Sequence, residues 1–131
     1  PMDSLTVNID GVEYTINPFR GELGFKIQAK ILKAIAPALK NIVKGGGEEA
    51  PENIDIMSFF SDVVSNLVGS NNEDEILRLF KDILSRTYKG NNTINFDTEF
   101  AQDYTKLYKL VFEVIVFNYK DVFSELGMNV G

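Results

Sequence analysis

The chain contains neither cysteine nor histidine. Without cysteine it cannot form disulfides, thiolate metal sites or thiol nucleophiles. Without histidine it lacks the commonest general base near neutral pH and the commonest zinc ligand. Catalysis would have to use carboxylates, lysines, hydroxyls or a carboxylate-bound magnesium ion. We therefore expect no catalytic residue, no metal and no cofactor.

The chain also lacks a basic excess and a long apolar run. Its net charge is −6, so nucleic-acid phosphates would repel it and we expect no nucleic-acid partner. The charge is uneven, because residues through Gly45 carry +2 and the rest carries −8. Its most apolar stretch is too short and too charged for a bilayer, which needs about 20 mostly apolar residues. The opening residues show no signal-peptide pattern. We expect no membrane partner.

Length and composition favour one small globular domain. The chain has 131 residues, of which 44% are hydrophobic and 24% charged, and these values suit a single packed core. We expect residues 1–131 to form one domain, mostly α, with about four helices and an N-terminal β-hairpin.

Two short alternating segments predict the hairpin over residues 4–17. Leu5–Ile9 and Val12–Ile16 each alternate apolar and polar residues, and Asp10-Gly11 joins them. Asp-Gly between such runs is the strongest short hairpin signal. Because an isolated hairpin is marginal in water, it should lie on helices or join another sheet.

The remaining chain shows four helical patterns of apolar residues. We predict helices over about residues 22–43, 54–68, 73–88 and 98–126. The expected N-caps of the last three are Asp55, Asn72 and Asp97. The short connection between the second and third predicts an antiparallel pair.

A proline and a Gly/Glu-rich segment interrupt the helical patterns in the first half of the chain. Pro37 should kink or break the first helix near Ala36, because proline lacks the backbone donor and clashes with the preceding turn. Residues 45–53, GGGEEAPEN, have almost nothing apolar to bury and predict a mobile linker.

We expect the chain to be organised around one central helix containing Phe100–Phe117. Apolar residues recur there at spacings of three and four, and further apolar residues widen that face. The polar stripe that remains is narrow: Glu99, Gln102, Lys106, Lys109 and Glu113. Such a helix must be covered on most of its circumference. A partner or a second copy of the chain is an alternative source of part of this cover, so a homo-oligomer stays open.

Two groups of side chains are candidates for partner binding. Aromatic residues gather late in the sequence, and aromatics are enriched at interaction sites; the first helix carries a basic stripe that could dock an acidic segment. The candidates are Tyr104, Tyr108, Phe112, Phe117, Tyr119, Phe123, Lys26, Lys30 and Lys33. The alternatives are an ordinary aromatic core and a solvated lysine face.

Acidic clusters are better explained by helix starts than by chemistry. Glu73-Asp74-Glu75 suits the positive end of a helix dipole and lacks the spacing of a calcium loop. Asp97, Glu99 and Asp103 would need one carboxylate desolvated in a cleft to act as an acid–base pair.

Three stretches resemble the tail assembly chaperones of long-tailed phages. LTVNIDGVEYTINPFRGELGFKIQAKILKAIAPAL resembles the family's opening, with an "idgkey" hairpin, an "i-p-f-x-g" phrase and an Ala/Leu-rich helix ending near "g-p-a-l". The Gly/Glu-rich linker and the two helices after it are similar to the family's middle. LVFEVIVFNYKDVFSELG resembles the closing "e-v-i-x-v-N-F-x-d-f-f" phrase, with Tyr119 where phenylalanine is more usual.

The resemblance implies a non-enzymatic chaperone made in the host bacterial cytoplasm. It would bind the tape measure protein, shield its hydrophobic helices, help recruit tail tube protein and be absent from the mature virion. The family often has a longer frameshifted product. The alternatives are a structural tail or adaptor component and a metal-dependent carboxylate enzyme.

Overall fold

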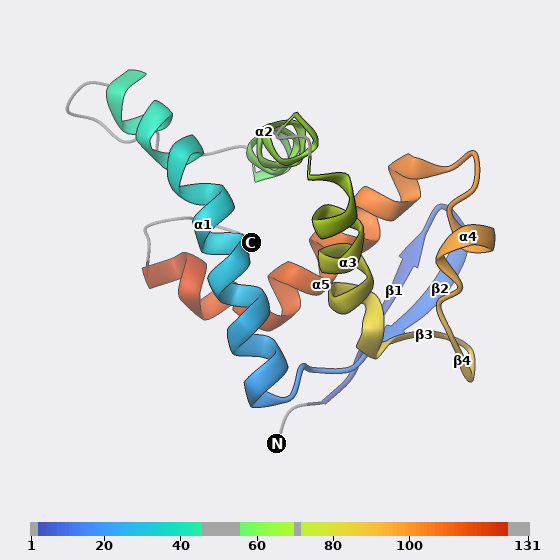
Figure 1. Cartoon of the computed structure of the whole chain (residues 1–131). Coiled ribbons are helices and arrows are strands. Elements are labelled where there is room, and N and C mark those ends of the chain that lie inside the picture. The colour runs from blue at the N-terminus through green and yellow to red at the C-terminus, as the bar shows by residue number, and fades with distance from the viewer. Residues whose placement is uncertain (1–2, 46–55, 70–71, 126–131) are drawn as a thin grey trace.

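The computed structural model describes residues 3–45, 56–69 and 72–125 (Figure 1). Its elements, in order, are β1 (Leu5–Ile9), β2 (Val12–Ile16), α1 (Gly21–Gly45), α2 (Ile56–Val68), α3 (Glu73–Ile83), the 3-10 turn η1 (Leu84–Arg86), β3 (Thr87–Lys89), β4 (Asn92–Thr93), α4 (Phe96–Glu99) and α5 (Tyr104–Glu125). The fold is therefore mostly α with an N-terminal hairpin, as the sequence predicts.

The predicted hairpin is confirmed and forms half of a four-stranded sheet. Asp10 and Gly11 have φ values of 51° and 89°, and positive φ at both central residues is what a type I′ turn requires. The Asn8 side chain accepts a hydrogen bond of 2.9 Å from the Gly11 N–H. The strand order is β1-β2-β3-β4, with all pairs antiparallel.

The sheet shortens the third predicted helix. α3 ends at Ile83 and not at residue 88, because Thr87 and Tyr88 pair with Ile16 and Thr15 of β2. The β2 edge offers backbone hydrogen bonds that compete with another helical turn. Gly90, with φ of 63°, then turns the chain into β4.

The central helix begins later than predicted. α4 is a separate short helix capped by Asn95 rather than Asp97, since the Asn95 side chain accepts from the Thr98 N–H. Asp103 caps α5 by accepting from the Lys106 N–H at 3.3 Å. The break between them places Phe100 outside any helix and fully buried, in edge-to-face contact with Phe96.

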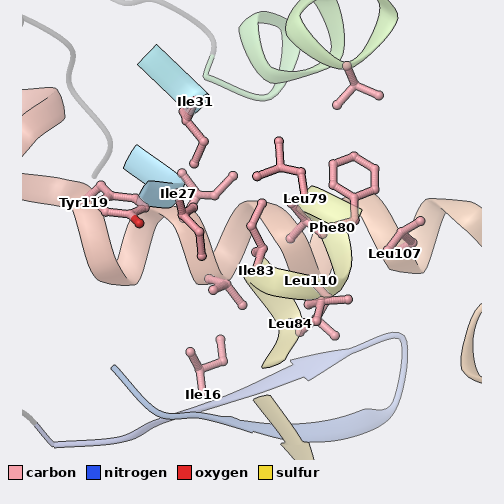
Figure 2. Close-up of a cluster of buried hydrophobic side chains, with 14 of the residues drawn as sticks. Ile16, Ile27, Ile31, Leu79, Phe80, Ile83, Leu84, Leu107, Leu110 and Tyr119 are labelled. Carbon is pink, nitrogen blue, oxygen red and sulfur yellow. The ribbon is translucent and has the colours of Figure 1, made fainter. Parts of the chain in front are cut away.

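α5 is covered as predicted. It runs across the molecule, with α1 and α3 packed on it and the hairpin on another side (Figure 1). Figure 2 shows Ile27 from α1, Ile83 from α3 and Ile16 from the hairpin pointing toward this helix. Its buried residues are Leu107, Leu110, Val111, Val114, Ile115, Tyr119 and Phe123.

Two packing predictions differ from the structure. The sequence predicts a kink or a break near Ala36, and the break is wrong, because α1 continues past Pro37 to Gly45. Helix-favouring alanine, leucine and lysine residues around Pro37 offset part of the lost backbone hydrogen bond. α2 and α3 cross steeply instead of forming an antiparallel pair, since α2 is seen nearly end-on while α3 runs down the view (Figure 1). Phe60 of α2 packs edge-to-face on Phe112 of α5, so α2 contacts the central helix as well as α3.

Some predictions lie outside the described residues. The linker prediction falls on residues 46–53 apart from Gly45, which is the last residue of α1. The Asp55 cap and the last residue of the predicted central helix also lie outside. Asn72 does occupy the N-cap position of α3, but its side chain makes no capping hydrogen bond.

Candidate functional site

Two residues of the predicted polar stripe, Glu99 and Lys106, belong to a partly buried ionic network. Glu99 accepts a hydrogen bond of 2.5 Å from the Tyr14 hydroxyl. Its carboxylate also lies 3.4 Å from the Lys106 ammonium and 3.3 Å from that of Lys89. The Glu99 and Lys106 side chains are only 10% and 12% exposed. The network therefore ties α4 and α5 to the sheet.

The electrostatics of Glu99 suit an ion pair rather than an acid catalyst. Burial works to raise the pKa of this carboxyl, but the Tyr14 hydrogen bond and the two lysines outweigh it and hold the pKa below its ordinary value. A general acid needs the opposite shift. Asp103 joins the network only at its edge, 3.9 Å from the Lys106 ammonium, and Asp97 is exposed.

Two kinds of site are absent from the part of the chain that the structure describes. Residues 3–45, 56–69 and 72–125 contain no group of three or more acidic side chains that could hold a metal ion. Across the same residues, no helix combines the length and the apolar character needed to cross a bilayer.

Three predicted binding residues form an aromatic row along α5. Tyr104, Tyr108 and Phe112 follow one another at intervals of four, so they share one helix face. Tyr104 is 58% exposed. Tyr108 is half-buried with its ring 6.3 Å from that of Phe80, and Phe112 is half-buried with its ring 5.5 Å from that of Phe60. The row thus runs from open surface to a covered end.

The covered end of the aromatic row adjoins an apolar cavity. This cavity, of about 40 Å³, lies between α1, α2, α3 and α5, and all its lining side chains are apolar. Phe60, Val63, Val64 and Leu67 line it from α2, and Phe112 lines it from α5. α2 therefore covers an apolar surface that α5 and α3 would otherwise expose.

The other aromatic candidates are covered by the chain itself. Tyr119 and Phe123 are buried, and Phe117 is partly buried against the core. The Tyr119 hydroxyl donates a hydrogen bond of 2.7 Å to the Gly24 carbonyl, and its ring lies 5.9 Å from that of Phe19. Burial raises the pKa of the Tyr119 hydroxyl. These three side chains are part of the packing that joins α5 to the rest.

The candidate lysines remain on the surface. Lys26 is exposed and pairs with Glu22 of the preceding turn at 3.3 Å. Lys30 and Lys33 are exposed on one side of a groove between α1 and α3. Tyr104 is the first residue of α5, and α1 crosses the opposite half of that helix (Figure 1), so the lysines and Tyr104 belong to separate parts of the surface.

Two exposed apolar side chains and one cation were missed by the sequence reasoning. Phe25 on α1 is 69% exposed, and Leu77 on α3 is 38% exposed. Arg78 lies across the groove from Lys30 and Lys33. The signal for Phe25 was available, because it lies off the apolar face formed by Leu23 and Ile27.

Comparison with known proteins identifies the family of the chain. The family model described as phage tail assembly chaperone protein, TAC, matches residues 10–129. No curated protein and no solved structure matches the chain. The family match extends from the hairpin turn past the end of α5, which is nearly the whole sequence. The chain belongs to the phage tail assembly chaperone family.

Proposed function

We propose that this phage tail assembly chaperone binds the tape measure protein and aids assembly of the tail tube around it. It acts in the host bacterial cytoplasm, without enzymatic activity, and does not remain in the mature virion. The aromatic row of α5 supplies the binding surface. The observation that carries this proposal is the exposed Tyr104 at the open end of a row that leads to an apolar cavity.

The chemistry of the row suits a helical, aggregation-prone client. Tyrosine and phenylalanine offer large apolar faces, and rings at successive helical turns match the apolar stripe of a client helix. The net charge of −6 keeps such a complex soluble. A chaperone of this kind needs binding surface and charge but no reaction chemistry.

Substitution of Tyr104 tests the proposal without disturbing the fold. Tyr104→Asp removes the exposed ring and places an acid in the first turn of α5, where the helix dipole favours it. We expect the soluble fraction of co-expressed tape measure protein to fall several-fold relative to the wild-type chain. Thr105→Asp is the matched control, because Thr105 is the exposed neighbour and receives the same charge.

The co-expression result has two informative outcomes. Wild-type levels of soluble tape measure protein with Tyr104→Asp would remove the aromatic row from the binding surface. Failure of the wild-type chain itself to solubilise the client would contradict the proposed function.

The alternative of a structural tail or adaptor component predicts a different location. A chaperone leaves before the particle is complete, whereas a structural component stays in a fixed ratio to the tail proteins. Mass spectrometry of purified virions should therefore detect the tape measure protein without this chain. Stoichiometric presence of the chain would favour the alternative.

A further inference from the structure

A second surface shares no lining residue with the aromatic row. It is a groove of about 530 Å³ between α1 and α3, a size at which proteins accept several side chains of a ligand. Its floor consists of side chains that are buried or half-buried: Ala34, Leu67, Ile76 and Leu79. Its exposed margins carry Lys30 and Lys33 on α1 and Arg78 on α3.

The charge of these margins is opposite to that of the whole chain. Lys30, Lys33 and Arg78 face one acid, Glu75, so the groove is locally positive in a chain of net charge −6. Among the residues that the structure describes, none of the three cations forms an ion pair. Lys26, Lys89, Lys106 and Lys109, in contrast, each pair with a carboxylate.

We propose that this groove binds a client helix whose apolar stripe is flanked by acidic residues. Apolar side chains of the helix would pack on the floor, and its carboxylates would pair with the three cations. Lys30 and Lys33 lie one turn apart on α1, which matches acids spaced three or four residues apart on the client. An apolar floor between charged margins is typical of helix-in-groove recognition.

The inference rests on the proposed function for the identity of the client, while the chemistry of the groove can be tested directly. It predicts that the client segment is acidic as well as amphipathic. The aromatic row has no such charge requirement. The two surfaces should therefore respond differently to salt, because ionic strength screens exposed charge pairs and leaves apolar contacts in place.

The probe is a labelled synthetic helix with leucines at positions i, i+3, i+4 and i+7 and glutamates on both flanks. A second peptide carries lysine at every glutamate position. Fluorescence anisotropy with the full chain should show the glutamate peptide binding at least about tenfold more tightly than the lysine peptide. The difference should shrink as salt is raised.

A charge-matched pair of variants locates the binding. The double variant Lys30→Glu, Lys33→Glu should weaken binding of the glutamate peptide by about tenfold, since two attractive pairs become repulsive. The control Lys81→Glu, Lys120→Glu changes the net charge equally at two exposed lysines outside the groove, and should bind like the wild type. Equal binding of the two peptides, or an equal loss in the control, would overturn the inference.

The two proposals fail separately. If the wild-type chain solubilises the tape measure protein but does not discriminate between the peptides, the groove assignment is wrong and the function stands. If the wild-type chain does not solubilise that client, the proposed function is wrong, and the peptide titration still decides what the groove binds.

Discussion

At the scale of single residues, Glu99 joins three parts of the fold. Its carboxylate receives the Tyr14 hydroxyl from β2 and lies beside Lys89 of β3 and Lys106 of α5. Because the Glu99 and Lys106 side chains are only 10% and 12% exposed, removal of either leaves the other charge shielded from water with less compensation. Glu99 therefore contributes to stability through its ionised form.

We predict that stability depends on pH through this carboxylate. The pKa of Glu99 is lowered in the folded chain, so its contribution is present above about pH 4.3 and is lost as the pH falls through the folded-state pKa. Glu99→Gln should be less stable than the wild type at pH 7, and the two should converge in acid. Urea unfolding followed by circular dichroism between pH 3 and pH 7 measures the difference.

A variant of one lysine gives the control for this prediction. Lys106→Met removes one cation beside Glu99 but keeps the carboxylate. In the Lys106→Met background, the stability difference at pH 7 between chains with Glu99 and chains with Glu99→Gln should be smaller, but it should not vanish. A constant difference between wild type and Glu99→Gln at every pH would show that the carboxylate is not the titrating group responsible.

Which aromatic residues are exposed and which are buried could not be predicted at this scale. The sequence indicates correctly that Tyr104, Tyr108 and Phe112 share a helix face, because the 3.6-residue period is a local property. The burial of Tyr119 and Phe123 depends on α1 and α2, which are distant in the sequence. Periodicity likewise placed Glu99 and Lys106 on a polar stripe, but it could not predict that their side chains would be largely buried.

At the scale of elements, local signals were sufficient for some boundaries and insufficient for others. The hairpin was predictable because Asp10-Gly11 determines its turn within a few residues. The end of α3 was not, since the strand that follows it pairs with β2 some 70 residues earlier. The break before α5 could not be predicted, because Phe100 and Tyr104 keep the four-residue spacing of apolar positions across it.

Asn118 links two elements near the end of α5. Its side chain accepts a hydrogen bond of 2.9 Å from the Phe19 N–H and donates one of 2.9 Å to the Val114 carbonyl. The next residue, Tyr119, departs from helical geometry with φ of −125° and ψ of 17°. Asn118 thus fixes the segment before α1 against the place where α5 bends.

We predict that Asn118→Ala destabilises the fold by about 1–3 kcal/mol, because the N–H of the buried Phe19 loses its acceptor. Chemical denaturation measures the change. Asn66→Ala on the exposed side of α2 is the matched control and should be neutral or slightly stabilising, since alanine favours helix. Equal effects of the two substitutions would contradict a linking role for Asn118.

At the scale of the whole molecule, the described core draws on every long helix and on the hairpin. This supports our proposal that the chain forms one domain. The chain carries a net charge of −6. Two surfaces differ from this overall character: the aromatic row is largely apolar, and the groove between α1 and α3 is locally basic. The fold class and the family could be predicted from the sequence, whereas the groove could not, because its two sides come from helices that meet only in the folded chain.

We propose that the aromatic row contacts the tape measure protein during tail assembly. The most direct measurement is site-specific photo-crosslinking in infected cells, with a photoreactive phenylalanine at position 104 and, as control, at the exposed position 98 on α4. The account predicts an adduct containing tape measure protein from position 104 and none from position 98. The absence of that adduct from position 104, with the protein folded and expressed, would contradict it.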